Sequence, residues 1–575
     1  MDFVSPLGPL PPIPDDLTIP QFLLDSWHPI RPVKTEPTPW FIEDATGREV
    51  PFEERADDYC ATVDIGENDV VCIFSPNHID YPIAIWAIHR LGAIATTANP
   101  AYTADELLYQ IKTTNASVLL AHSGSLATSE EAARLAGITS DRIVLIDSPP
   151  GTSRLTLEKL IQSGLSKPAT FVERRLGPGE AKTKIALLNF SSGTTGRPKA
   201  VTIPHYAVIA NVLQMSFHGK VHIEYAPKNE RRYVPGDVAM AVLPFYLLNM
   251  HFMLFFGATL VIAPKFNLAD MLRSIERYRV SHLLLVPPMV VLLCKSPLVR
   301  KHDLSSVKAV MCGAAPLSAE LTRQFIEVLP QSSIGQGYGK HNIGMTETCT
   351  TVTFPRLDQK IGTLGSGGRL LPGVTARVLK QDGTFAGPNE AGELIVKGPS
   401  MAISYLNNTE ATKETFIFFK GDPDRWVRTG DEVMINEFAE IYVLDRIKEI
   451  MKVRGFQVAP AELEGLLLDH PDVDDACVVG VPDEYSGEVP LAFIVPSRRA
   501  VERMSKDKNE NATLKAVLCK YVADKKVHYK RLAGGVEFVD FIPKNPSGKL
   551  LRRFLRDKAK AMKAAALEST VRARL

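Results

Sequence analysis

Short hydrophobic runs alternate with amphipathic segments through the first part of the chain. Residues 69–77 (DVVCIFSPN), 116–122 (ASVLLAH) and 141–147 (DRIVLID) are β-rich and bounded by turn residues. Residues 81–99 have the pattern of a helix followed by a strand, and residues 129–138 that of a helix. Because strands alternate with helices, the pattern predicts parallel sheets covered by helices.

The same alternation returns farther along, and the pattern then changes. Strand candidates at 237–245, 257–263, 282–288 and 307–316 are separated by helical segments. Residues 373–398 instead alternate with turn residues. This second pattern predicts a smaller antiparallel β region.

The chain past Asp445 has the pattern of a compact α+β unit that ends in a helix rich in Lys and Ala. Residues 498–515 are polar and charged, which predicts a solvated loop leading into a helix. Together, the patterns predict an α/β protein. Its large N-terminal domain, residues 1–444, contains parallel-sheet α/β subdomains and a small β region, and a small α+β domain covers residues 445–575.

Composition narrows the class of protein. The chain has 575 residues, which is too long for one core, and its net charge of +1 favours neither nucleic acid nor an anionic membrane as a partner. The 7 cysteines are scattered without a CxxC pair, which indicates a reducing compartment rather than a disulfide framework or a zinc site. The proline-rich start lacks the features of a signal peptide. Two apolar stretches, 251–264 and 281–294, are too short to span a bilayer.

Residues 191–199 read SSGTTGRPK and follow an apolar run at 185–190. Gly, Ser and Thr offer many N–H and O–H donors with little bulk, which suits phosphate oxygens, and Lys199 adds a point charge. The spacing is not that of a Walker A loop. On these residues alone, a phosphate-binding loop and a plain surface turn both remain open.

Further motifs follow this loop along the chain. They are GAAPLS from Gly313, QGYG from Gln336, GMTET from Gly344, GELIVKGP at 392–399, WVRTGD at 426–431, DRIKEIMKVRGFQVAPAELE at 445–464 and PKNPSGKLLRR at 543–553. In this order they resemble the adenylate-forming superfamily of acyl-CoA synthetases, 4-coumarate–CoA ligases and luciferases, and most closely the 4-coumarate–CoA-ligase-like branch found in fungi. The resemblance covers nearly the whole chain. It implies an ATP-dependent acid–CoA ligase that forms an acyl-adenylate and passes the acyl group to coenzyme A.

The resemblance also implies nucleotide contacts in the N-terminal domain. The loop on the β- and γ-phosphates corresponds to Ser191, Ser192, Gly193, Thr194, Thr195, Gly196 and Lys199. The strip beside the adenine corresponds to Gly313, Ala314, Ala315 and Pro316, and further nucleotide contacts correspond to Gln336, Gly337 and Tyr338. These residues are expected to line one ATP site.

Four more positions carry charge or a hydroxyl toward that site, again by resemblance. Thr346 corresponds to a contact of the α-phosphate, and Glu347 to the carboxylate that holds Mg²⁺. Asp431 corresponds to the acceptor of both ribose hydroxyls, and Arg446 to a ribose–phosphate contact. One protein carboxylate suffices for Mg²⁺ because the ion shares its hard oxygen ligands with phosphates.

The C-terminal domain is expected to rotate between the two half-reactions about a hinge near Lys448. Lys549 corresponds to the catalytic lysine that bridges the substrate carboxylate and the α-phosphate. After rotation, Lys452 and Gln457 would face the adenylate, with Arg454 and Gly455 near coenzyme A. Replacing Lys549 with Ala is expected to slow adenylation by orders of magnitude and thiolysis of preformed acyl-adenylate much less.

The sequence departs from the family pattern in three places. Residues 340–344 interrupt the usual QGYGMTET, and a His that usually follows the Phe-Tyr pair is missing at Tyr246, Leu247 and Leu248. The segment between VPFEE and IGENDVV is also shorter than in the family pattern by a few helical turns. A longer loop costs only about 0.6 kcal/mol per doubling, so folding should survive. A shift of reacting groups by about 1 Å can cost on the order of a hundredfold in rate, so reduced activity is expected, and a mispredicted exon boundary would also explain the differences.

Two alternatives to a CoA ligase follow. One is an adenylating enzyme with a non-CoA acceptor, and the other is a pseudoenzyme of the same fold that binds nucleotide without turnover. The acid, aryl or fatty, is not determined by the sequence. The last residues, Ala573, Arg574 and Leu575, resemble the C-terminal targeting signal that the peroxisomal import receptor binds. This resemblance predicts a peroxisomal enzyme, with the cytoplasm as the alternative.

Overall fold

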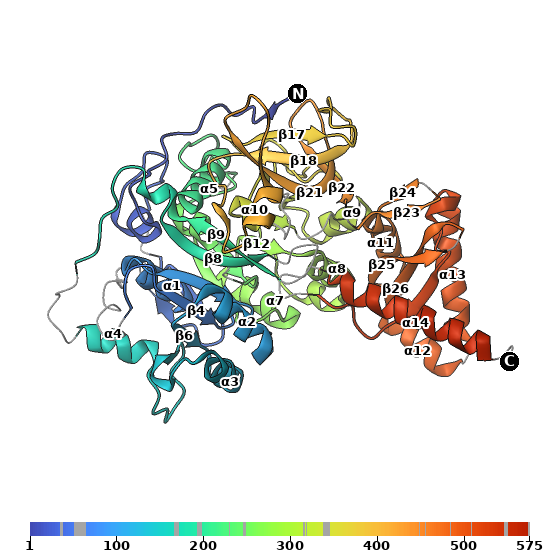
Figure 1. Cartoon of the computed structure of the whole chain (residues 1–575), viewed down its shortest axis with the longest axis horizontal. Coiled ribbons are helices and arrows are strands. Elements are labelled where there is room, and N and C mark those ends of the chain that lie inside the picture. The colour runs from blue at the N-terminus through green and yellow to red at the C-terminus, as the bar shows by residue number, and fades with distance from the viewer. Residues whose placement is uncertain are drawn as a thin grey trace.

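The computed structural model describes the chain except residues 35–37, 51–64, 166–171, 192–197, 229, 245–248, 314–316, 318, 337–344, 448, 455, 484, 508, 545–549 and 573–575. In Figure 1 the C-terminal part, coloured orange to red, lies beside the larger N-terminal part, next to helices α8 and α9. α8 spans Pro287–Lys295 and α9 spans Ala319–Val328. The fold therefore has a smaller C-terminal part beside a larger N-terminal part.

The first sheet of the N-terminal part has seven strands. Its order is β19-β9-β8-β5-β4-β6-β7, with bounds Ser404–Tyr405, Lys199–Pro204, Ile185–Ser191, Ile94–Ala98, Val70–Phe74, Val118–Ala121 and Ile143–Leu145. The strands from β8 to β7 are parallel, whereas β9 and β19 are antiparallel additions. All five residues of β4 are buried, with Val71 and Ile73 on one face and Val70, Cys72 and Phe74 on the other. A strand buried on both faces is what its continuous apolar run predicts.

The second sheet also has seven strands. Its order is β14-β13-β12-β10-β11-β2-β3, with bounds Ser333–Gln336, Ala309–Cys312, His282–Leu285, Val238–Ala241, Thr259–Ile262, Phe41–Glu43 and Glu49–Val50. Every neighbouring pair is parallel except β2 with β3. The strands predicted from the apolar runs in both sheets are thus confirmed.

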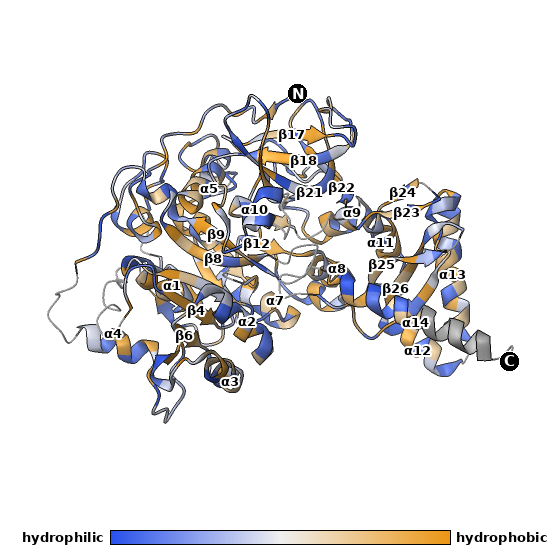
Figure 2. Cartoon of the chain, viewed as in Figure 1, coloured by the Kyte–Doolittle hydropathy of each residue, from blue (hydrophilic) through white to orange (hydrophobic). Residues whose placement is uncertain are grey.

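Helices pack on both faces of these two sheets, as Figure 1 shows for the first of them. Their bounds are Tyr81–Arg90 (α1), Ala104–Thr114 (α2), Leu126–Ala136 (α3), Leu157–Leu165 (α4), His205–His218 (α5), Asn249–Phe255 (α6) and Leu268–Tyr278 (α7). Figure 2 shows the hydrophobic colour along the strands, for example β4, β8 and β12. The described helices include none that is long and apolar enough to cross a membrane.

The smaller β region after residue 360 forms an antiparallel sheet, as predicted. Its strands are β1 (Phe3–Val4), β17 (Thr375–Leu379), β18 (Gly392–Lys397), β20 (Phe416–Phe418), β21 (Arg425–Ile435) and β22 (Ile441–Arg446). A two-stranded ladder of β15 (Thr353–Phe354) and β16 (Arg369–Leu370) and helix α10 (Thr409–Thr415) accompany it. The N-terminal strand β1 joins this sheet through β17, a long-range pairing that the sequence pattern did not predict.

The C-terminal unit is a five-stranded sheet covered by helices. Its elements are β23 (Met451–Val453), β24 (Phe456–Val458), α11 (Pro460–Leu468), β25 (Val473–Asp483), β26 (Gly487–Pro496), α12 (Arg498–Lys506), α13 (Glu510–Lys525), β27 (Gly535–Phe538) and α14 (Arg552–Arg572). The expected α+β tail and its final helix are confirmed.

One prediction in this unit is wrong. Residues 498–506, predicted to form a solvated loop, form helix α12. Ser497 caps the helix by accepting a hydrogen bond from the backbone N–H of Ala500, and Ala500 is the buried residue of the segment. Met504, one turn after Ala500, also packs on the C-terminal core, so the inward positions do have helical spacing. Charged and polar residues fill most of the segment, and its apolar signal is therefore weak.

Candidate active site

The edge of the first sheet brings Lys199 and Glu347 to the same tyrosine. Ser191 ends β8 and pairs with Lys199, the first residue of β9. The ammonium of Lys199 lies 5.1 Å from the centre of the Tyr405 ring, which β19 places beside β9. The Tyr405 hydroxyl donates to Oε1 of Glu347 at 2.7 Å. Cation, aromatic ring and carboxylate therefore form one contiguous cluster next to the predicted phosphate loop.

Glu347 is held in a buried position by local backbone structure. It lies in a 3-10 helix, Thr346–Thr348, and is 1% exposed, and its carbonyl accepts from the N–H of Ala402 at 2.9 Å. Burial and the adjacent Glu347 charge raise the pKa of Tyr405 far above its ordinary value. Tyr405 therefore stays protonated and serves as a donor to the carboxylate.

This carboxylate fits the Mg²⁺ role that the resemblance implies. Mg²⁺ prefers oxygen ligands, usually one or two carboxylates together with substrate phosphates. Burying a carboxylate costs a large desolvation free energy unless the group is hydrogen-bonded or paired with a cation. The hydrogen bond from Tyr405 offsets part of this cost for Glu347. Within the described residues, no group of three or more His, Cys, Asp or Glu side chains could hold a metal on its own. The donor set thus suits an ion that arrives with phosphates.

Asp431 and Arg446 meet at one end of the β21–β22 hairpin. The two residues are direct partners in the antiparallel register, and Nε of Arg446 lies 3.4 Å from Oδ1 of Asp431. Asp431 is 4% exposed and its N–H donates to Oγ1 of Thr429 at 3.1 Å. The pair combines a carboxylate that can accept hydrogen bonds from hydroxyl groups with a guanidinium that can approach a phosphate.

Gly313 and Gln336 lie on neighbouring strands of the second sheet. Gly313 follows β13 and donates its N–H to Leu285 at 3.1 Å, and Gln336 ends β14 opposite Cys312. Oε1 of Gln336 accepts from the N–H of Leu317 at 2.9 Å, so its side chain reaches from β14 to Leu317. Ligand sites of α/β sheets form at the carboxyl ends of their strands, where both residues lie.

The predicted C-terminal contacts lie on the β23–β24 hairpin. Lys452 pairs with Gln457, and the side chains of Lys452, Arg454 and Gln457 are exposed to solvent. Arg454 has a φ of 52° at the turn, a left-handed conformation that is uncommon for a residue other than Gly. Its guanidinium lies 4.9 Å from the centre of the Tyr485 ring. In this orientation of the domain, the hairpin residues do not line a buried site.

Several predicted positions lie outside the described residues. They are Ser192, Gly193, Thr194, Thr195, Gly196, Ala314, Ala315, Pro316, Gly337, Tyr338, Lys448, Gly455, Lys549, Ala573, Arg574 and Leu575. The interruption at 340–344 and the departure at 246–248 lie outside them as well. Their predicted roles stay predictions.

Sequence reasoning missed two residues that organise the cluster. Tyr405 lies on a two-residue strand without any periodic signal. Arg425, at the start of β21, donates from its guanidinium to the carbonyls of Ile403 at 2.6 Å and Ala402 at 2.7 Å. It thereby ties the strand that leads to Asp431 to the segment that precedes Tyr405. The one sequence signal for Tyr405 is that it is an aromatic residue shortly after the GELIVKGP motif.

Comparison with known families identifies two matching segments. The family described as AMP-binding enzyme matches residues 61–406, and the family described as AMP-binding enzyme C-terminal domain matches residues 462–549. Among curated proteins, 4-coumarate–CoA ligase 2 of Oryza sativa subsp. japonica is 34% identical over 567 residues, covering 95% of this chain and 94% of the relative. Peroxisomal OPC-8:0-CoA ligase 1 of Arabidopsis thaliana is 34% identical over 563 residues, with 95% and 94% covered.

Solved structures share the fold. The anthranilate CoA ligase AuaEII in complex with anthranoyl-AMP superposes with a TM-score of 0.77 at 23% identity, covering 96% of this chain and 99% of that one. ATP-bound MatB from Rhodopseudomonas palustris superposes with a TM-score of 0.76 at 24% identity, covering 95% and 99%. At this identity the likeness establishes the architecture.

Proposed function

The chain belongs to the adenylate-forming AMP-binding enzyme family and is an ATP-dependent acid–CoA ligase, and from that premise we propose which of its residues carry the reaction. Enzymes of this kind use ATP, Mg²⁺ and coenzyme A. The observation that supports the assignment most strongly is the cluster of Lys199, Tyr405 and Glu347 at the end of the predicted phosphate loop.

In the first half-reaction, an oxygen of the acid's carboxylate attacks the α-phosphorus of ATP, and pyrophosphate leaves. Lys199 places its positive charge on the β- and γ-phosphates, and Tyr405 orients the Glu347 carboxylate through its hydroxyl. Mg²⁺, when held by Glu347 and phosphate oxygens, supplies positive charge against the charge that develops on the leaving group. Asp431 receives the ribose hydroxyls, while Arg446 lies beside it. Positioning and charge stabilisation account for most of the catalysis of such a step.

In the second half-reaction, the thiolate of coenzyme A attacks the acyl carbonyl, and AMP leaves with the electron pair of the broken C–O bond. We place the domain boundary between residues 444 and 445 and the hinge near Lys448. The solvent exposure of Lys452, Arg454 and Gln457 supports a rotation, because those residues can reach the adenylate only if the domain turns.

The location in the cell and one protein partner belong to this proposal too. The Ala573-Arg574-Leu575 tail is proposed to bind the peroxisomal import receptor. The peroxisomal OPC-8:0-CoA ligase among the relatives supports the peroxisome, while the 4-coumarate–CoA ligases leave the cytoplasm as the alternative. Fluorescent proteins fused to the N-terminus, with and without the last three residues of the chain, are located by microscopy. Fluorescence in peroxisomes that is lost without the last three residues supports the peroxisome, and cytoplasmic fluorescence of both fusions supports the cytoplasm.

The test of the reaction measures the two half-reactions separately. Pyrophosphate release is followed with ATP, Mg²⁺ and a panel of aryl and aliphatic acids, and thioester formation is followed after addition of coenzyme A. Lys549→Ala is expected to lower pyrophosphate release by orders of magnitude and thiolysis of preformed acyl-adenylate much less. Equal losses in both steps would contradict the role of Lys549. Release that is independent of coenzyme A would point to another acceptor, and ATP binding without release to a pseudoenzyme.

A further inference from the structure

A row of polar side chains runs along one face of helix α5. Asn211, Gln214 and His218 follow one another at intervals of three and four residues, so they lie on the same face of the helix. All three side chains are buried. Because a buried polar group is costly unless it is hydrogen-bonded, the partners of this row show what the helix face holds.

Asn211 uses its whole side-chain amide on groups at and around the segment that follows Glu347. Its Nδ2 donates to the carbonyl of Thr351 at 2.9 Å, and its Oδ1 accepts from the N–H of Thr351 at 3.2 Å and from the hydroxyl of Thr350 at 2.6 Å. Nδ2 also donates to Oε1 of Gln214 at 3.2 Å. Two donor and two acceptor positions are thus occupied, so the amide has one orientation and binds both backbone groups of Thr351.

The backbone between Glu347 and these bonds is strained. Cys349 is buried and has a φ of 65°, a left-handed conformation that is uncommon for a residue other than Gly. Such a conformation persists only where the surrounding contacts hold the chain in place. On one side, Oγ1 of Thr348 accepts from the N–H of Met345 at 3.3 Å, and on the other side the Asn211 amide holds the chain. Loss of that amide would let the chain relax at Cys349 and move the turn that carries Glu347.

Tyr405 and Asn211 hold different parts of this region. The Tyr405 hydroxyl binds the Glu347 carboxylate itself, whereas Asn211 binds the chain three and four residues farther on. Helix α5 follows directly after β9, which begins at Lys199. The Asn211 amide therefore also ties the segment after the carboxylate to the strand that carries the cation of the cluster.

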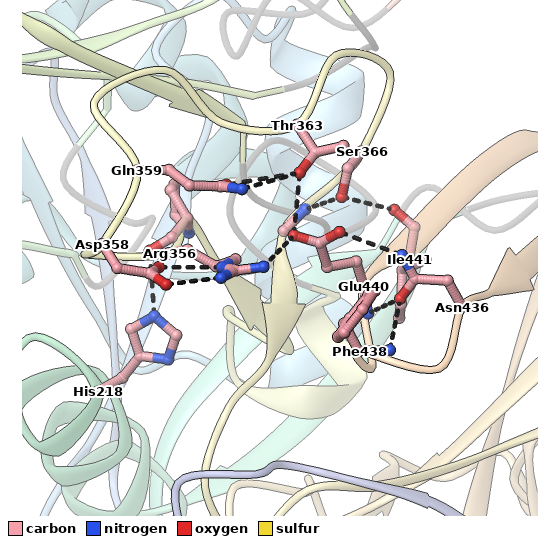
Figure 3. Close-up of polar contacts among 12 residues, drawn as sticks. His218, Arg356, Asp358, Gln359, Thr363, Ser366, Asn436, Phe438, Glu440 and Ile441 are labelled. Atoms are coloured by element: carbon pink, nitrogen blue, oxygen red, sulfur yellow. Dashed lines mark hydrogen bonds and ion pairs between the residues drawn. The ribbon is translucent and has the colours of Figure 1, made fainter.

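His218, at the end of the row, holds a part of the chain that lies farther from Glu347 in the sequence. Its Nε2 donates to the carbonyl of Pro355 at 3.1 Å. Figure 3 shows His218 beside the loop in which Arg356 pairs with Asp358 at 2.6 Å. His218 thus shares the burial of Asn211 and its bond to a backbone carbonyl, but it binds a different loop. It is therefore a matched control for Asn211.

We propose that Asn211 is a positioning residue that places the Glu347 carboxylate for Mg²⁺. The inference rests on the proposed function, because it takes Glu347 to hold the ion together with the phosphates of ATP. Asn211 acts through the backbone: it fixes Thr351, and the strained residue Cys349 passes this constraint to the turn of Glu347. Replacement of a residue that orients a metal ligand typically lowers metal affinity about 10- to 100-fold, and the same order is expected for Asn211.

The test measures nucleotide binding without turnover in the full-length protein. The nucleotide is α,β-methylene-ATP, from which pyrophosphate cannot leave, and it is titrated calorimetrically once in EDTA and once in Mg²⁺. The Kd in EDTA divided by the Kd in Mg²⁺ gives the gain in affinity due to the metal, and binding in EDTA shows that the site is folded. Asn211→Leu, which has a similar size but no polar atoms, should lower this gain at least about tenfold and change the Kd in EDTA less than about threefold.

Two further variants make the result interpretable. Thr350→Val removes the hydroxyl that binds Asn211 and should lower the gain about threefold, and it decides the test if Asn211→Leu binds no nucleotide in EDTA. His218→Leu should change the gain by less than about twofold, because the lost bond lies elsewhere. An unchanged gain in the deciding variant, or an equal fall in His218→Leu, would overturn the proposal.

The binding measurement separates this inference from the proposed reaction. A lower gain in Asn211→Leu, without pyrophosphate release from any acid in the unmodified protein, would retain the role of Asn211 and reject the ligase reaction. Pyrophosphate release by the unmodified protein, with the same gain in Asn211→Leu, would retain the reaction and reject the role of Asn211.

Discussion

Tyr405 lies between the ammonium of Lys199 and the carboxylate of Glu347. Its hydroxyl is the described donor to a carboxylate that is 1% exposed, and burial keeps that hydroxyl protonated. Because a buried hydrogen bond to a charged group is stronger than one between neutral groups, the tyrosine is expected to orient Glu347. In the proposed reaction it would act through Glu347, as a positioning residue.

Tyr405→Phe removes this donor and retains the ring. Hydrogen bonds to charged groups contribute about 1.5–3 kcal/mol, so pyrophosphate release at limiting Mg²⁺ should fall roughly 10- to 150-fold. The Mg²⁺ concentration for half-maximal release should rise. Thr415 lies 3.5 Å from the Tyr405 hydroxyl and serves as the control. An equal rise in the Mg²⁺ requirement of Thr415→Val would contradict a specific role of the Tyr405–Glu347 bond.

Asp445, near the end of β22, is expected to make the stability of the fold depend on pH. Burial raises the pKa of Asp445 to about 6 from its ordinary value of 3.8, although the carboxylate accepts hydrogen bonds from the N–H groups of Arg446 and Ala461. A carboxyl whose pKa is raised on folding binds its proton more tightly in the folded state. Its stabilising contribution is therefore fully present below pH 3.8 and is lost as the pH rises through 6.

Asp445→Asn should remove this response. Relative to the variant, the unmodified protein should lose about 1.3 kcal/mol of unfolding free energy between pH 5 and pH 7. Urea unfolding at half-unit pH steps measures the difference. A difference between the two proteins that is constant over this range would show that the Asp445 pKa is not raised.

At the scale of elements, an arginine joins the last helix to the rest of the C-terminal domain. Arg552 opens α14, and its guanidinium pairs with Glu464 on α11 and with Glu449 in the linker that follows β22. The side chains of Arg552 and Glu464 are 13% and 7% exposed. Removal of Arg552 would leave the buried carboxylate of Glu464 without this cation, which is strongly destabilising.

Arg552→Met is expected to destabilise the C-terminal domain by about 3–5 kcal/mol. Arg553→Met is the matched control, because the side chain of Arg553 is 76% exposed and lies 3.9 Å from Asp557. Hydrogen exchange of the α11 amides reads out the change locally. Similar exchange rates in the two variants would mean that Arg552 does not hold α11 and α14 together.

At the scale of the whole molecule, a polar contact joins the C-terminal unit to helix α8 of the N-terminal part. Lys295, the last residue of α8, donates from Nζ to the carbonyl of Val473 at 2.5 Å and lies 3.9 Å from Asp474. The ion pair is partly exposed, with side chains 31% and 48% exposed. Such contacts are weak enough to break during a domain rotation.

Lys295→Met is therefore expected to shift the domain orientation only modestly. Exposed ion pairs contribute about 0.2–1 kcal/mol, so the population of this orientation relative to others should fall up to roughly fivefold. Single-molecule energy transfer between fluorophores on α3 and α13 measures the change. Lys301→Met, at a nearby exposed lysine, should leave the distribution unchanged. A shift of the same size in both variants would exclude a specific role for Lys295.

The sequence by itself determined the two parallel sheets, the antiparallel β region and the α+β tail. Strands buried on both faces, such as Val70–Phe74, must be continuously apolar, and that requirement is visible in the sequence. It also supplied the order of motifs, and it placed Lys199, Glu347 and the Asp431–Arg446 pair among the candidate site residues. The prediction failed at 498–506, where a mostly polar helix packs Ala500 and Met504 against the core.

Only the tertiary structure decided which side chains complete the site. Tyr405, Arg425 and the β1–β17 pairing act through contacts between residues far apart in the chain, which leave no periodic mark. The row of His282, Ala309 and Ser333 likewise depends on the register of three neighbouring strands. Local patterns report which face of an element is buried. What that face meets depends on how the elements pack.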